Sequence, residues 1–172
     1  MDRSELEAAL AATTGRLRRV EDEQAIVSAV YQYGHAINAG DRELWLDVFT
    51  QDGSWAARSA SDAPWKFEID GRDALAEWFD GNARRWPVGS MVHTNSSPRV
   101  AIDGDRAEAR TFYLTMLRGN GRPALRSTGI YVDQLVRCED GRWRICERRA
   151  TGSLSDGGPD SEARELERYR TV

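Results

Sequence analysis

The sequence predicts an α+β fold in which N-terminal helices pack on a curved mixed or antiparallel sheet. Three observations support this fold class. Apolar residues recur with helical spacing over residues 26–37 and 72–86, the period changes to two over residues 91–151, and Asp-Gly pairs at 103–104 and 140–141 mark hairpin turns. Helices followed by a run of strands are typical of this class. We expect a cone-shaped fold that encloses a cavity suited to a small molecule.

Three helices are expected before residue 50. Residues 4–19 begin with SELE, which is typical of a capping box. A second helix begins at acidic residues 21–23 and ends at Gly40, and one of its faces carries the apolar stripe Ile26, Val30, Tyr33 and Ile37. Asp41 is expected to cap a short third helix over residues 42–49, with Leu44, Trp45, Val48 and Phe49 available for burial.

The expected strands follow these helices. A turn at residues 51–53 precedes two short strands at 54–58 and 65–69, and a helix over residues 72–86 is stopped by Pro87. A four-stranded meander then covers residues 91–102, 106–118, 125–138 and 142–151. We divide the chain into an N-terminal helical extension (1–19), one domain (20–152) and a flexible tail (153–172) in which residues 161–170 form a short helix.

Composition excludes several classes of function. The chain has 172 residues and a net charge of -4, and its acidic and basic residues are interspersed, whereas nucleic-acid binders are more often basic with one clustered patch. The apolar runs are too short to span a membrane, and the N-terminus lacks the apolar core of a signal peptide. We therefore expect a cytoplasmic protein with no nucleic-acid partner and no membrane partner.

The two cysteines are not expected to pair. They flank the last hairpin, and a two-residue turn at 140–141 would place Cys138 opposite Trp143 and not opposite Cys146. Two cysteines and two histidines without close spacing also predict no metal site.

Four segments in order resemble the SnoaL-like branch of the NTF2-like superfamily, whose members include polyketide cyclases and dehydratases. They are YGHAINAGD with FTQDGSW (33–41 and 49–55), IDGRDALAEWF (69–79), MVHTNSSPRVAIDGDRAEA (91–109) and GIYVDQLVRCEDGRWRICERR (129–149). The resemblance covers roughly residues 20–150 and implies the cone-shaped fold. It says less about activity, because this fold hosts enzymes and non-catalytic subunits alike.

The resemblance also implies a set of catalytic residues. Tyr33 matches a pocket tyrosine, His93 a histidine on the first meander strand, and Arg148 an arginine on the last strand. The usual aspartate position holds Asn38, which cannot supply the negative charge that would raise the pKa of a histidine. Asn38 either binds the imidazole or a substrate carbonyl, or it is a helix C-terminal residue before Gly40. With an ordinary pKa of about 6.5, His93 alone would remain a usable acid or base.

Other residues are candidates for the walls of the cavity. Alternation along the strands and the family resemblance select as substrate-binding residues Trp45, Trp55, Asn95, Tyr113, Tyr131 and Asp133. Asp133 would supply the missing carboxylate if it shared the concave face with Tyr131. Arg148 and Arg149 alternate, so one of them points inward. His35 lies about 200° around the helix from Tyr33 and is taken as non-catalytic.

The resemblance implies a cofactor-independent lyase or isomerase that moves a proton on a small, apolar, oxygen-bearing molecule of aromatic, polyketide-like or steroid-like type. The alternative is a non-catalytic binding protein, or an accessory subunit that resembles the small subunit of ring-hydroxylating dioxygenases. A homodimer or homotrimer is expected in either case, formed through the outer face of the sheet, where Arg110, Phe112, Arg126 and Arg137 are expected.

Overall fold

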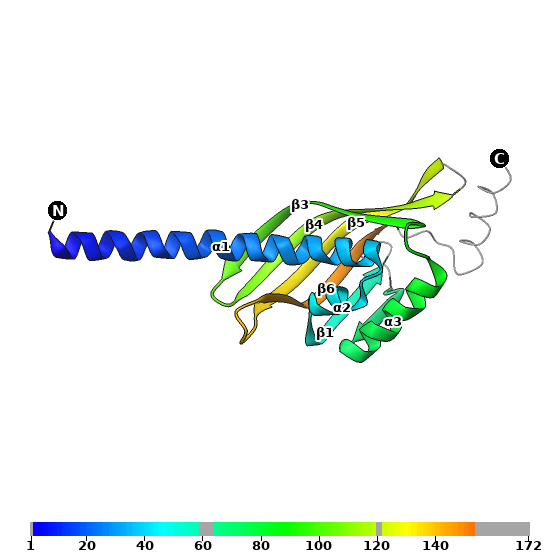
Figure 1. Ribbon diagram of the computed structural model, residues 1–172, viewed down its shortest axis with the longest axis horizontal. Coiled ribbons are helices and arrows are strands. Elements are labelled where there is room, and N and C mark those ends of the chain that lie inside the picture. Colours follow the sequence, from blue (N-terminus) through cyan, green and yellow to red (C-terminus); the bar gives the residue numbers. More distant parts are fainter. Residues whose placement is uncertain (1, 59–63, 120–121, 154–172) are drawn as a thin grey trace.

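The computed structural model describes residues 2–58, 64–119 and 122–153. Its helices are α1 (Arg3–Ala39), α2 (Arg42–Asp47) and α3 (Arg72–Arg85). The strands are β1 (Phe49–Arg58), β2 (Phe67–Asp70), β3 (Met91–Asp103), β4 (Arg106–Gly119), β5 (Arg122–Arg137) and β6 (Trp143–Ser153). They form one six-stranded sheet in the order β2-β1-β6-β5-β4-β3, in which only β1 and β6 run parallel. Helices on one curved mixed sheet confirm the predicted α+β fold (Figure 1).

Helix α1 is continuous, so the prediction of two helices before residue 40 is wrong. Neither glycine nor proline lies near Val20, and hence nothing in the local backbone interrupts the helix there. The capping box was also placed two residues too late. Asp2 is the N-cap, its carboxylate accepts from the backbone N–H of Glu5, and the Glu5 carboxylate accepts from the backbone N–H of Asp2. Gly40 ends the helix in the left-handed conformation, with φ of 70°.

The C-terminal half of α1 covers the sheet through the predicted apolar stripe. Ile26, Val30 and Tyr33 are fully buried, and Ile37 packs against the same core. Trp45 and Phe49 complete the core at the end of the helix pair, where Trp45 stacks on Trp78 of α3 with ring centroids 5.6 Å apart. This arrangement places Tyr33 between α2 and the sheet, at the centre of the fold.

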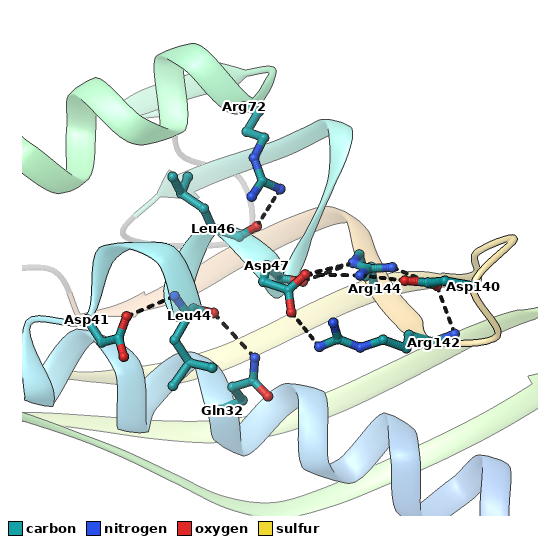
Figure 2. Close-up of polar contacts among 9 residues, drawn as sticks. All are labelled: Gln32, Asp41, Leu44, Leu46, Asp47, Arg72, Asp140, Arg142 and Arg144. Atoms are coloured by element: carbon teal, nitrogen blue, oxygen red, sulfur yellow. Dashed lines mark hydrogen bonds and ion pairs between the residues drawn. The ribbon is translucent and has the colours of Figure 1, made fainter.

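Helix α2 is held in place by polar contacts that come from three other segments (Figure 2). Asp41 caps it as predicted, since the Leu44 N–H donates to its carboxylate at 3.0 Å. At the other end of α2, Asp47 accepts from Arg142 and Arg144 at the hairpin between β5 and β6. Arg144 also donates to Asp140 in the turn, at 2.9 Å. These contacts fix the start of β1 against β6.

Two local turn predictions are corrected by the pairing. Residues 51–53, expected as a turn, belong to β1, and the register of β1 against β6 shifts between Phe49 and Ser54. In the last hairpin Trp143 lies opposite Arg137 and not Cys138, because the Gly141 N–H donates to the Cys138 carbonyl and lengthens the turn by one residue. Both cysteines are free, as expected.

A β-bulge changes the predicted outer face of the sheet. The register of β4 against β5 shifts at Thr115, so Leu125 becomes exposed and Arg126 turns inward over Trp86, with the guanidinium 5.1 Å from the ring centroid. The prediction that Arg126 lies on the outer face is therefore wrong. Arg137 is also largely buried, because it pairs with Asp22 of α1. Arg110 and Phe112 remain on the exposed side.

The remaining boundaries agree with prediction within a few residues. Helix α3 and strands β3 and β4 begin where periodicity placed them. Residues 59–63 and 120–121 lie outside the described residues, as do most of the predicted tail and its short helix. The division into an extension, one domain and a tail stays a prediction.

Candidate functional site

The centre of the fold holds a fully buried ion pair. Strands β5 and β6 pair antiparallel with Asp133 opposite Arg148, so their side chains emerge side by side on the face covered by α1. The guanidinium donates twice to the carboxylate, Nε to Oδ1 and Nη2 to Oδ2, both at 2.7 Å. Both side chains are 0% exposed. Of the two adjacent arginines Arg148 is the inward one, and Arg149 is exposed.

Two tyrosine rings enclose the guanidinium. The Cζ atom of Arg148 lies 4.0 Å from the ring centroid of Tyr33 and 4.3 Å from that of Tyr131. Tyr113 stacks on Tyr131 at 4.2 Å and extends the aromatic layer toward β3. Although burial alone would lower the pKa of Arg148, the carboxylate of Asp133 raises it above the ordinary value. Arg148 is thus a permanent positive charge in an aromatic environment.

The tyrosines around the ion pair are neutral hydrogen-bond donors at neutral pH. Burial raises the pKa of Tyr33, and the charge of Arg148 opposes this only in part. Burial likewise raises the pKa of Tyr131 well above 10.0 and that of Tyr113 to about 12. None of these groups can act as a base near pH 7, but each can donate a proton or a hydrogen bond.

Several buried polar atoms at this centre make no hydrogen bond within the described part of the chain. They include the hydroxyls of Tyr33 and Tyr113 and the Nη1 atom of Arg148. The indole Nε1 atoms of Trp45 and Trp55 are also buried without a hydrogen-bond partner among the described residues. Buried donors are normally paired, because leaving one without a partner costs roughly 1–3 kcal/mol. Groups of this kind are candidates for binding a polar atom of a ligand.

His93 lies on β3 and is fixed to α1 through its main chain. The Asn38 amide Nδ2 donates to the His93 carbonyl at 2.8 Å, and the His93 N–H donates to Asn38 Oδ1 at 2.7 Å. The imidazole Nδ1 lies 3.4 Å from the same oxygen. Asn38 is within the helix, so it is not the left-handed C-terminal residue that was considered. Its amide instead makes two hydrogen bonds to the main chain of β3, which are the bonds that a neighbouring strand would make.

The pKa of His93 is lowered to about 4, so the imidazole is neutral at pH 7. Burial is the main cause, and the positive charges of Arg126 and Arg148 add to it. The expected pKa of about 6.5 is therefore not found here. Asp133 lies on the inner face, as the hypothesis of a substitute carboxylate required, but it is bound by Arg148.

Two further contacts position the site. Asn95 Nδ2 donates to the Val30 carbonyl at 2.8 Å, which joins β3 to α1 a second time. Gly129 and Gly152 lie opposite each other beneath Tyr113, and a Cβ atom on Gly152 would come within 2.9 Å of the Tyr113 hydroxyl. The two glycines thus give the ring its place on the sheet.

The structure brings most of the predicted residues into one interior. Tyr33 contacts Trp45, Trp55 and Tyr131 with ring centroids 5.8–6.0 Å apart. His93, Asn38 and Asn95 lie at the junction of α1 and β3. His35 is exposed, as expected. Arg126 was missed as an interior residue, and alternation could not have found it because the bulge reverses the faces.

The described residues contain no group of three or more histidine, cysteine, aspartate or glutamate side chains that could hold a metal ion. None of their helices is long and apolar enough to cross a membrane.

Comparison with known proteins adds a family and a set of similar folds. The model of the SnoaL-like domain matches residues 18–149. An NTF2-like protein with a cystatin-like fold from Novosphingobium aromaticivorans is 25% identical, with a TM-score of 0.74 over 90% of this chain and 95% of that one. None of the curated proteins compared with the chain matches it significantly.

Two further solved structures from Novosphingobium aromaticivorans show the fold alone. One is provisionally assigned as a scytalone dehydratase (19% identity, TM-score 0.65, 81% of this chain and 90% of that one). The other is the β subunit of a provisionally assigned aromatic-ring-hydroxylating dioxygenase (17% identity, TM-score 0.70, 83% and 95%).

Proposed function

The chain belongs to the SnoaL-like domain family, and from this premise we propose that it is a cofactor-independent lyase or isomerase. Its substrate is a small, mostly apolar molecule that carries a carbonyl or phenolic oxygen, of aromatic, polyketide-like or steroid-like type. The reaction transfers a proton next to that oxygen, and loss of water or migration of a double bond follows.

The observation that supports this proposal is a pair of buried donors, the Tyr33 hydroxyl and Arg148 Nη1, which make no hydrogen bond of full geometry among the described residues. The hydroxyl nevertheless lies close enough to Tyr131 and Arg148 for both side chains to affect its pKa. Asp133 fixes the guanidinium through two hydrogen bonds, so the remaining donor is held in one orientation. An oxygen bound between these donors would gain negative charge as the neighbouring C–H bond loses its proton. Both side chains are fully buried, and donors fixed in advance away from bulk water stabilise such a charge strongly.

His93 is the base in this scheme. Its lowered pKa leaves the imidazole neutral and able to accept a proton at pH 7, although it is a weak base. A weak base suffices where the oxyanion is strongly stabilised, as in ketosteroid isomerase, whose aspartate base has a pKa of about 4.6. Asn38 holds the main chain of His93, so we assign it a positioning role in place of direct contact with substrate.

The test is proton exchange in deuterated water. Candidate phenols, enones, hydroxysteroids and polyketide fragments are first screened by thermal shift, and ligands that stabilise the protein are then incubated in deuterated water and weighed by mass spectrometry. Wild type should introduce deuterium or eliminate water. His93→Gln should lose this activity, and Tyr33→Phe should lower it about a hundredfold, the effect of removing one oxyanion donor.

Matched controls are available on α1 itself. His35 and Tyr31 are exposed on the same helix, so His35→Gln and Tyr31→Phe should retain full exchange. Because the Tyr33 hydroxyl is buried without a hydrogen bond of full geometry in the described chain, Tyr33→Phe should unfold at or above the wild-type temperature. Exchange that survives in His93→Gln would contradict the proposed base.

The second candidate is a non-catalytic binding protein or accessory subunit. The low pKa of His93 and the commitment of Asn38 to main-chain bonds favour it. The two distant fold relatives do not decide between the candidates, since they are less than 20% identical. Ligands that stabilise wild type without exchange, elimination or isomerisation would support this candidate. A cytoplasmic location and a homodimer or homotrimer formed through the exposed side of the sheet stay predictions.

A further inference from the structure

The N-terminal half of α1 lies outside the domain core. Figure 1 shows this half projecting beyond the sheet. Every residue from Arg3 to Glu21 is exposed, and the first buried residue of the helix is Asp22. At 1.5 Å per residue, this segment is about 28 Å long. The helix is nevertheless well defined at its start, by the capping box of Asp2 and Glu5 and by an ion pair between Arg3 and Glu7. An unsupported helix of this length is marginal in water.

One face of α1 carries an apolar stripe that nothing in the described chain covers. We call it the outer stripe: Leu6, Leu10, Leu17, Val20 and Tyr31. Its members are between 43% and 65% exposed, and they are five of the nine large hydrophobic side chains that the structure describes as exposed. Thr13, Gln24 and Val27 fill the three missing places in an alternation of three and four residues. This spacing is that of a coiled-coil contact.

The outer stripe is separate from the face that packs on the sheet. At 100° per residue, its members lie within about 40° of Leu6, whereas Ile26, Val30 and Tyr33 are centred about 180° to 240° away. The core face therefore cannot account for it. The Thr13 hydroxyl donates to the Ala9 carbonyl within the helix at 2.8 Å, so the stripe contains no unpaired hydroxyl at this place.

Charges beside the outer stripe indicate which partner it fits. Glu5 and Glu7 lie near the start of the helix, and Arg16 and Arg18 lie about three turns later. Glu7 and Arg18 flank the stripe on one side, and Glu5 and Arg16 flank it on the other. In an antiparallel pair related by a two-fold axis, each side meets the same side of the second copy.

A two-fold axis between Ala11 and Ala12 fits both the spacing of the apolar stripe and the positions of the flanking charges. It places Leu6 against Leu17 of the second copy and Leu10 against Thr13. The same register brings Glu7 close to the second copy's Arg18 and Glu5 close to its Arg16. A parallel pair would instead bring the arginines of both copies to the same level, which is unfavourable.

We propose that residues 3–21 of α1 form an antiparallel two-helix contact with the same segment of a second copy of this chain. The outer stripe from Leu6 to Val20 is buried in this contact, Tyr31 lies beyond it, and the flanking charges form intermolecular ion pairs. The contact is distinct from the outer face of the sheet, and it does not depend on the proposed enzymatic function.

The first test changes the stripe without touching the core. Leu10→Glu/Leu17→Glu places two charges on the stripe, and Ala11→Glu/Ala12→Glu places two charges on the same exposed segment away from it. By light scattering after gel filtration, the stripe variant should show half the mass of wild type, and the control should keep the wild-type mass. Both substituted pairs are exposed, so circular dichroism should show a folded sheet in each. A wild-type monomer, or a mass that the stripe variant does not change, would overturn the proposal.

The second test fixes the orientation by disulfide formation. In the antiparallel register the two copies of residue 6 are about 16 Å apart along the axis, while residue 6 lies beside residue 17 of the other copy. Oxidised Leu6→Cys/Leu17→Cys should therefore run as a covalent dimer on a denaturing gel, and Leu6→Cys alone should not. Wild type, with its two half-buried cysteines, is the background control. A covalent dimer from Leu6→Cys alone would indicate a parallel contact and refute this register.

Discussion

Arg148 and Asp133 show how two charges are kept in the interior. They are tolerated without any exposure because they bond to each other in two places, and the rings of two tyrosines pack against the guanidinium. The pair uses Nε and Nη2 and leaves Nη1 without a partner among the described residues. One side chain thus combines a structural ion pair with the proposed ligand donor.

Removing one partner of this pair should cost far more than removing an exposed arginine beside it. Arg148→Met leaves the Asp133 carboxylate buried and unpaired, which should lower the free energy of unfolding by about 3–5 kcal/mol in urea denaturation. Arg149→Met removes an exposed ion pair on the same strand and should cost less than about 1 kcal/mol. Asp133→Leu/Arg148→Met should recover part of the loss. Equal effects at the two arginines would show that the buried pair is not needed for stability.

His93 should make the stability of the protein depend on pH. Its pKa is about 4 in the folded state against 6.5 as the ordinary value, so the unfolded chain binds more protons between these two values. Stability therefore rises with pH across this window and is lost on acidification. From about pH 7.5 to about pH 5.0 the contribution of His93 should fall by about 2 kcal/mol.

Urea denaturation at the two pH values measures this change. In His93→Gln the free energy of unfolding should lose the part of its pH dependence that comes from His93. His35→Gln, at an exposed position, should keep the pH dependence of wild type. A His93→Gln profile identical to wild type would mean that the imidazole is not desolvated in the folded state.

At the scale of elements, α1 and β3 are joined by two asparagines that reach from one element to the main chain of the other. Asn38 bonds the N–H and the carbonyl of His93, and Asn95 bonds the carbonyl of Val30. Strand β3 is at the edge of the sheet, so its outer main-chain groups have no neighbouring strand. Asn38 provides partners for two of these groups, and the two asparagines together fix the distance between helix and sheet over the site.

Removing the Asn38 amide should loosen β3. Asn38→Ala leaves two main-chain groups of His93 unpaired and should lower the free energy of unfolding by about 2–3 kcal/mol. The His93 amide should exchange with solvent faster in hydrogen-exchange measurements. Gln24→Ala, at an exposed position of the same helix, should change stability by less than about 0.5 kcal/mol. Unchanged exchange at His93 would show that the amide contact does not hold the strand.

At the scale of the whole molecule, α1 belongs to two environments. Its second half completes the core, and its first half presents the outer stripe to solvent. If a second copy binds the first half, folding and association are linked by mass action.

The melting temperature of wild type should therefore rise with protein concentration. Over a roughly hundredfold range of concentration, the melting temperature of Leu10→Glu/Leu17→Glu should rise less than that of wild type, and Ala11→Glu/Ala12→Glu should follow wild type. Thermal unfolding of wild type and of the two variants is monitored by circular dichroism. A constant melting temperature in wild type would count against association through any surface.

The sequence by itself determined the fold class and the inner face of most elements. The stripe of Ile26, Val30 and Tyr33 follows from the helical period, and the inward position of Tyr131 and Asp133 from the alternation of a strand. These patterns are local, and each reports which face of an element is buried. Because the candidate site lies on the buried faces, the same patterns also predicted which residues lie near it.

Only the tertiary structure decided which groups bind each other. Asp133 pairs with Arg148, and Asn38 with the main chain of His93, because strand register and helix placement bring together residues far apart in the sequence. The bulge beside Thr115 turned Arg126 inward, and one such irregularity reverses every face predicted beyond it. The low pKa of His93 likewise depends on burial and on charges from other strands, which no local pattern records.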